Sequence, residues 1–62
     1  MKIKKAMRLV YQGHRLRRRD WDEGLYCVSV ESDVVFYNDQ NKLVEAFYLD
    51  IIDLTADDWE VL

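Results

Sequence analysis

The chain has 62 residues, a formal net charge of −3, one cysteine and one histidine. A chain this short is expected to form a single domain, residues 1–62, whose small core usually needs disulfides, metal ions or association to support it. Cys27 has no partner for an intrachain disulfide, and Cys27 and His14 are too few ligands for a zinc site. We therefore expect no metal and no cofactor, and association as a homo-oligomer.

The charges are distributed unevenly along the chain. Every charged residue up to Arg19 is basic, and every one after Lys42 is acidic. This asymmetry is typical of a chain that pairs its two halves, pairs between subunits, or presents faces of opposite sign. The net acidity argues against a duplex DNA partner. No apolar run is long enough for a membrane span, and the basic start lacks the apolar stretch of a signal peptide, so we expect a cytoplasmic protein.

Residues 2–12 are predicted to form an amphipathic helix. Its apolar residues recur at helical spacing on one face, and basic residues occupy the other face. Gly13 follows directly and can adopt the left-handed conformation that ends a helix. The apolar face comprises Ile3, Ala6, Met7, Val10 and Tyr11.

Residues 14–19 are predicted to form a short strand, followed by a turn over residues 20–24. Alternation places Leu16 and Arg18 on one side of this strand and the other three arginines on the opposite side. Residues 25–30 predict a second strand, with Cys27 buried opposite a face that includes Tyr26.

The rest of the chain predicts a hairpin, a helical turn and a last strand. Residues 31–33 interrupt the second strand, and residues 34–37 and 42–48 form a hairpin around the polar turn 38–41. The pattern from Thr55 to Asp58 predicts a capped helical turn before a final strand at 59–62. The fold class is therefore α+β, an N-terminal helix packed on a small antiparallel β-sheet with a short C-terminal helical turn and strand.

Catalysis is not expected of this chain. No serine, threonine or cysteine is placed beside a base, and the two glycines are isolated, so no phosphate loop exists. The carboxylates of Asp53, Asp57 and Asp58 could form an acid–base pair or bind a divalent ion, but at a terminal turn such groups more often cap and solubilise. We predict that the protein is not an enzyme.

The two tryptophans differ in context. Trp59 is expected in the core. Trp21 lies among charged residues beside a turn, so it is either a lid on the core or a platform for a ligand.

The chain resembles the second type of Thoeris anti-defence family, which consists of small phage proteins. The resemblance rests on two patterns, A6-M-x-L9-x-x-x-G13-x-x-L-R-R18-x-x-W21 and D53-L-x-A56-x-D58-W59-E-V61. The chain has Trp21-Asp22-Glu23 where the family usually has Trp-Asn-Gly, and Asp50-Ile51-Ile52 where it usually has Ser-Gln-Thr. The longer central loops of the family are also missing.

The resemblance implies a sponge that binds and sequesters a cyclic nucleotide immune signal without cleaving it. It also implies that the protein is a homo-oligomer, a dimer or a tetramer, and acts in the bacterial host cytoplasm. It implies ligand-binding roles for Arg17, Arg18, Trp21, Asp53 and Asp58. Two alternatives remain open at this stage. One is a protein-interaction inhibitor of a bacterial defence system, of the anti-CRISPR type, and the other is a small single-strand nucleic-acid binder that uses the arginine strand and Trp21.

Overall fold

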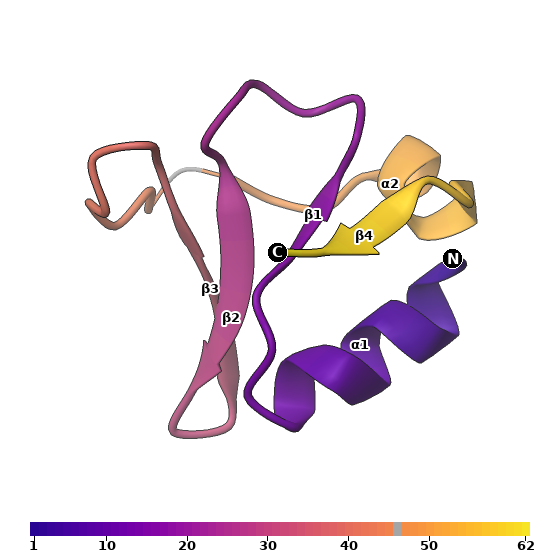
Figure 1. Ribbon diagram of the computed structural model, residues 1–62, viewed down its shortest axis with the longest axis horizontal. Helices are drawn as coiled ribbons and strands as arrows, with labels where there is room; N and C mark the ends of the chain where they lie inside the picture. The colour runs from indigo at the N-terminus through magenta and orange to yellow at the C-terminus, as the bar shows by residue number, and fades with distance from the viewer. Residues whose placement is uncertain (46) are drawn as a thin grey trace.

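Two helices and four strands occur in the computed structural model, which describes residues 1–45 and 47–62. They are, in chain order, α1 (Ile3–Tyr11), β1 (Leu16–Arg18), β2 (Tyr26–Val30), β3 (Asp33–Tyr37), α2 (Ile51–Thr55) and β4 (Trp59–Val61). The strands form one antiparallel sheet in the order β3-β2-β1-β4, so β4 returns from the end of the chain to pair with β1 (Figure 1). The predicted α+β class is confirmed.

Helix α1 covers one face of this sheet. Ala6 and Val10 are completely buried, and the lysines of the helix point to solvent, as the helical spacing predicts. Tyr11 is the exception, because it is 58% exposed although its spacing placed it on the apolar face. The helix ends before Gly13, whose φ of 97° is the left-handed conformation expected there.

The buried side of the sheet follows the alternation of the strands. Leu16 lies opposite Cys27, and Cys27 lies opposite Phe36, so three neighbouring strands each contribute one buried side chain. Trp59 of β4 is 2% exposed and completes this cluster with α1, which confirms its place in the core. The predicted sides of β1 are also confirmed, because Leu16 and Arg18 are both buried.

The predicted hairpin was wrong. The hairpin of the structure joins β2 to β3 through Glu31 and Ser32, whose φ values of 51° and 72° are those of a tight type I′ turn. Residues 42–48, described apart from Ala46, form no strand, and a single bridge joins Leu43 to Tyr37. The predicted turn over residues 38–41 is a turn, in which the Asn38 side chain accepts hydrogen bonds from the backbone of Gln40 and Lys42.

The predicted C-terminal helical turn was also misplaced. Thr55 does not begin a helix but ends α2, and its hydroxyl donates back to the carbonyl of Ile51. Asp50 is the N-cap, and its side chain accepts hydrogen bonds from the backbone of Ile52 and Asp53. Asp50 and Asp53 have the capping-box spacing, and this pair outcompetes the Thr55 pattern.

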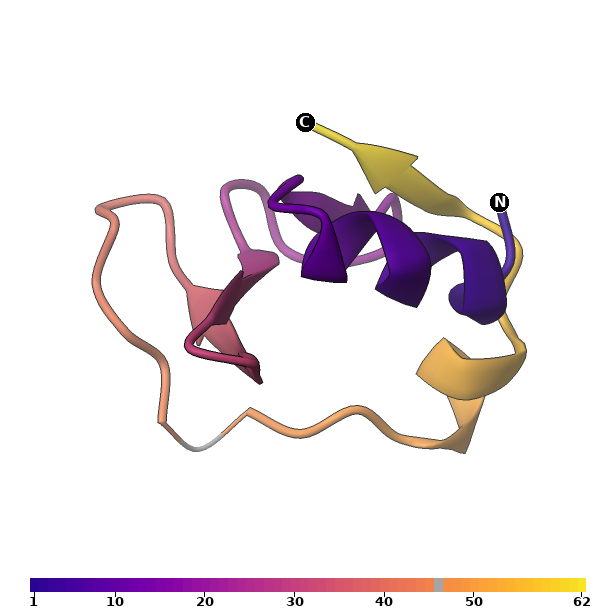
Figure 2. The same ribbon diagram turned by 90° about the horizontal axis from the view of Figure 1, so that it is seen from below.

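The chain after β3 runs back across the molecule on the side away from β4. Figure 2 shows this stretch and α2 below α1, with β4 and the C-terminus above. Helix α2 contacts α1, and the strand alternation leaves the other face of the sheet to side chains such as Arg17, Tyr26 and Tyr37. Among the residues that the structure describes, no helix covers that outer face.

Candidate functional site

Arg18 is the centre of the most elaborate polar cluster among the described residues. It is only 8% exposed, because alternation along β1 turns it toward α2 and the last loop. Its Nε and Nη2 atoms donate to the two carboxylate oxygens of Asp58, at 2.8 and 3.3 Å. Its Nη1 atom donates to Oδ1 of Asp53 at 2.8 Å. Each nitrogen of the guanidinium therefore binds a carboxylate, the geometry in which arginine pairs are strongest.

Asp53 is held in place by the helix that carries it. Its Oδ2 atom accepts a hydrogen bond from the backbone of Asp50 at 3.0 Å, which closes the capping box of α2. Its Oδ1 atom accepts hydrogen bonds from both Arg18 and Trp21. Its backbone carbonyl accepts a hydrogen bond from the indole of Trp59 at 3.0 Å. Local helix capping thus orients a carboxylate that two distant residues, Arg18 and Trp21, use.

Trp21 joins this polar cluster to the core. Its indole nitrogen donates to Asp53 at 3.0 Å, and its ring meets Trp59 and Phe47 edge-on, with centroids 5.1 and 5.2 Å apart. The ring is half-buried, so one part packs and another part reaches solvent. The two interpretations of Trp21, a lid on the core and a ligand platform, are therefore compatible in one side chain.

The structure brings together four of the five predicted site residues: Arg18, Trp21, Asp53 and Asp58. Arg17 lies on the opposite side of β1, where it donates to the carbonyl of Trp21 at 2.8 Å and lies 3.6 Å from Glu60. It supports the Trp21 backbone and is not part of the same cluster. Because Arg17, Arg18 and Arg19 all form ion pairs within the chain, the arginine strand offers few free cations to a single-stranded nucleic acid.

The cluster changes the acidity of its members. Burial raises the pKa of Asp53, but the hydrogen bonds from Arg18, from the Asp50 backbone and from Trp21 outweigh this effect, so the pKa lies below its ordinary value. The hydrogen bonds from Arg18 likewise lower the pKa of Asp58. The two aspartates, Asp58 first, raise the pKa of Arg18 further. All three groups remain charged at neutral pH, and together they carry one net negative charge.

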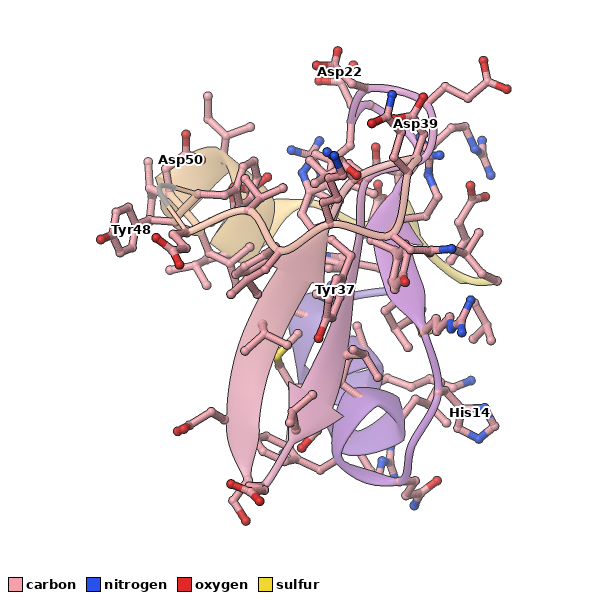
Figure 3. The ribbon with its side chains drawn as sticks, turned by 90° about the vertical axis from the view of Figure 1, so that its left-hand side faces the viewer. His14, Asp22, Tyr37, Asp39, Tyr48 and Asp50 are labelled. Atoms are coloured by element: carbon pink, nitrogen blue, oxygen red, sulfur yellow. The ribbon has the colours of Figure 1, made fainter. Side chains whose placement is uncertain are left out.

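A hollow of about 260 Å³ opens beside this cluster. One part of its wall is aromatic, and the other part consists of acidic side chains around Arg18. Figure 3 shows Tyr48 and Asp50 on the same side of the molecule, where Tyr48 projects outward. The residues that line the hollow are Arg18, Asp20, Trp21, Phe47, Tyr48, Asp50, Ile52 and Asp53.

Sequence reasoning found Arg18, Trp21 and Asp53 of this hollow and missed the rest of its lining. Phe47 and Tyr48 belong to the segment that the sequence predicts as the second strand of a hairpin. The capping-box spacing of Asp50 and Asp53 was a signal available in the sequence. It fixes the start of α2 and therefore the direction from which the preceding residues enter the helix. Nothing in the local pattern indicates that residues 47 and 48 face Trp21, since this contact depends on the path of a loop without regular structure.

The arrangement can bind flat or hydroxyl-bearing groups more readily than bare anions. Aromatic rings offer stacking surfaces, and carboxylates accept hydrogen bonds from N–H and O–H donors. With Asp20, Asp50 and Asp53 around it and Arg18 already paired, the hollow repels a phosphate. Within the described residues, no group of three or more potential ligands is arranged to hold a metal ion. In the same part of the chain, no helix has the length and apolar character needed to cross a membrane.

Comparison with known proteins identifies the family. No curated protein matches the chain. A family model described as the Tad2-like, or Thoeris anti-defense 2-like, domain matches residues 1–62, the whole chain. This match confirms the resemblance carried by the patterns around Trp21 and Trp59, and it supports an anti-defence role. The chain belongs to the Tad2-like family of Thoeris anti-defence domains.

Proposed function

We propose that this protein binds a cyclic nucleotide immune signal in the bacterial cytoplasm and withholds it without cleaving it. The observation that carries the proposal is the hollow beside Arg18 and Asp53, in which Trp21, Phe47 and Tyr48 meet acidic acceptors. A nucleobase needs a stacking surface and acceptors for its exocyclic and ring N–H groups, and the hollow offers both.

The size of the hollow limits what this site can enclose within one chain. At about 260 Å³ it is smaller than the ~300–1,000 Å³ of pockets that enclose drug-sized ligands. One ring system therefore enters it, while the phosphates of the ligand stay outside, away from Asp20 and Asp50. This placement of the ring inside and the phosphates outside agrees with the acidic lining of the hollow, which disfavours phosphate and accepts hydrogen bonds from donors.

The proposal includes association and excludes turnover. A small core and two chain halves of opposite charge favour a homo-oligomer, which also places several hollows in one particle. Cleavage of a cyclic nucleotide needs a nucleophile and a base or a metal-bound water. Cys27 lies buried in the sheet, away from the hollow, and its raised pKa keeps the thiol protonated.

The test is calorimetric titration with a panel of cyclic nucleotides, comparing the wild-type protein with Tyr48→Ala. Tyr48 is 80% exposed, so its removal is expected to leave the fold intact. Loss of one stacking partner should weaken binding by roughly 5- to 150-fold, the equivalent of about 1–3 kcal/mol. Mass spectrometry of the ligand released after denaturation should recover the intact cyclic compound.

Tyr11→Ala is the matched control. Tyr11 is 58% exposed and lies on α1, outside the lining of the hollow, so its removal should leave binding unchanged. Equal losses in both variants, or no binding of any compound in the panel, would refute the proposed site. Recovery of a linear product would refute sequestration without cleavage.

A further inference from the structure

The four strands of the sheet are covered unequally on the side of α1. A helix with its side chains is about 10–12 Å wide and strands lie about 4.8 Å apart, so one helix covers two or three strands. Helix α1 packs on β1, β2 and β4, where Ala6 and Val10 are completely buried. The same side of β3 carries Val34 and Phe36, and it is covered by the stretch that follows this strand (Figure 2).

This stretch fills the space over β3 incompletely. A cavity of about 410 Å³ remains between α1, β3 and residues 43–45 and 47–49. Met7 lines it from α1, Val34 and Phe36 line it from β3, and Leu49 lines it from the stretch itself. Pockets of ~300–1,000 Å³ enclose small molecules, and an apolar cavity of only ~150 Å³ holds benzene. The volume therefore suits a small organic molecule rather than part of a macromolecule.

Three aromatic rings and one carboxylate give this cavity a chemical preference. Phe36, Phe47 and Tyr48 line it, and the rings of Phe36 and Phe47 lie 4.8 Å apart at an angle of 48°. Glu45 also lines it and is exposed, and no basic side chain occurs among the described residues of the lining. Aromatic faces and a carboxylate both attract cations, and aromatic linings are a common means of recognising alkylated ammonium ions.

The charges near the cavity favour the same kind of ligand. Every charged residue after Lys42 is acidic, and Asp33, at the start of β3, adds an exposed carboxylate beside Val34. An anion would be repelled by this field, and a neutral molecule would gain only from burial of its apolar surface. An organic cation gains from burial and from the field together.

We propose that this cavity is a binding site for a small organic ammonium ion. The alkyl or aryl body of the ligand lies inside, against Met7, Val34 and the aromatic rings, and its cationic group lies beside Glu45 at the solvent side. Phe47 and Tyr48 also line the hollow beside Arg18, but Met7 and Glu45 line only the cavity. The site is therefore additional to the proposed nucleotide site and does not rest on it.

The methionine methyl groups can locate the ligand by nuclear magnetic resonance. The chain has two methionines, of which Met7 lines the cavity and Met1 does not. The probes are hexyltrimethylammonium, hexanol and hexanesulfonate, which share one alkyl chain and differ in charge. The cation should shift the Met7 methyl signal to saturation and leave that of Met1 unchanged. Hexanol should bind roughly 3- to 30-fold more weakly than the cation, and the sulfonate more weakly still.

Glu45→Gln tests the carboxylate, and Asp57→Asn is the matched control. Both residues are exposed and both changes remove one negative charge, but Asp57 lies outside the lining of the cavity. Glu45→Gln should weaken binding of the cation by roughly 2- to 5-fold and leave binding of hexanol unchanged. Asp57→Asn should bind both probes as the wild type does. Circular dichroism verifies that each variant is folded.

Three results would overturn the proposal. They are a Met7 signal that the cation does not move, equal affinities for the three probes, and equal weakening of cation binding in the two variants. The last result would assign the attraction to the net charge of the protein and not to the cavity. Because Glu45 lies outside the hollow beside Arg18, and the two sites are measured with different ligands, either proposal can fail while the other stands.

Discussion

Four arginines within five residues have different roles, and their surroundings decide which. Arg18 is enclosed by Asp53 and Asp58, whereas Arg15 lies on an aromatic ring and remains exposed. A buried guanidinium is tolerable only when its charge is paired and its donors are used, which Arg18 achieves with bonds from all three nitrogens. Arginine therefore has two roles in this chain. Arg18 holds the C-terminal part of the chain, whereas Arg15 offers a contact at the surface.

The Arg18 cluster predicts a loss of stability in acid. The pKa values of Asp53 and Asp58 are lowered in the folded state from an ordinary value of 3.8. Their contribution to the free energy of unfolding is therefore complete above about pH 4 and is lost as the pH falls through the lowered folded values. Urea unfolding at pH 7, 5, 3 and 2 should give midpoints that are similar in the first two cases and fall in the last two.

Asp58→Asn is the control for this prediction, because it keeps the shape of the side chain and removes its charge. The variant should be less stable at pH 7, and its midpoint should depend less on pH below 4. A variant with the full acid dependence of the wild type would assign that dependence to other carboxylates.

At the scale of elements, strand pairing and contacts between loops determine the connections. The β2–β3 hairpin uses Glu31 and Ser32 at positive φ, although neither is the glycine or asparagine that such turns prefer. Five paired residues on each strand stabilise this turn against its local cost. The loop before β2 works differently, because Gly24 has a φ of 87° and lies against the backbone of Asp39, which joins two loops. Figure 3 shows Asp22 of the first loop and Asp39 of the second at the same end of the molecule.

The two glycines make a matched pair for measurement. In Gly24→Ala, the new methyl group would lie 2.6 Å from the Cα of Asp39, whereas in Gly13→Ala it would meet open space. Both variants adopt a strained backbone that costs roughly 1–2 kcal/mol. Gly24→Ala should lose about 1–3 kcal/mol more of the free energy of unfolding because two loops must separate. Urea denaturation compares the two, and equal losses would show that the Gly24 contact contributes little.

At the scale of the whole molecule, one core connects the two ends of the chain. Ala6 and Val10 of α1 and Trp59 of β4 belong to the same buried cluster, and β1 lies between β2 and β4 in the sheet. Cys27 is completely buried at the centre of this arrangement, and burial raises the pKa of its thiol to about 12. Its chemistry therefore reports on the opening of the whole fold.

Thiol labelling at pH 8 should measure global unfolding. A chain of this length is expected to have a stability of roughly 3–9 kcal/mol, so labelling should be about 10²- to 10⁶-fold slower than in denaturing urea. The logarithm of the labelling rate should rise with urea at the slope of the equilibrium transition. A rate that is independent of urea would instead indicate local opening of β2.

The sequence by itself determined the elements whose signals are local. The period of α1, the closing Gly13, the alternating sides of β1 and the burial of Cys27 follow from spacing that a short segment contains. The burial of Trp59 follows from the size of its apolar ring in a small domain. Its motifs also determined the family, since both patterns are continuous in the chain.

Only the tertiary structure decided which residues meet. The turn at Glu31 and Ser32 depends on strand pairing, and the path of residues 47 and 48 toward Trp21 depends on a loop without periodicity. Arg18 meets Asp53 and Asp58 only because β4 pairs with β1, which brings together residues 35 and 40 positions apart. Such contacts leave no periodic trace in either segment, because each segment satisfies its local preferences whether or not the other is near.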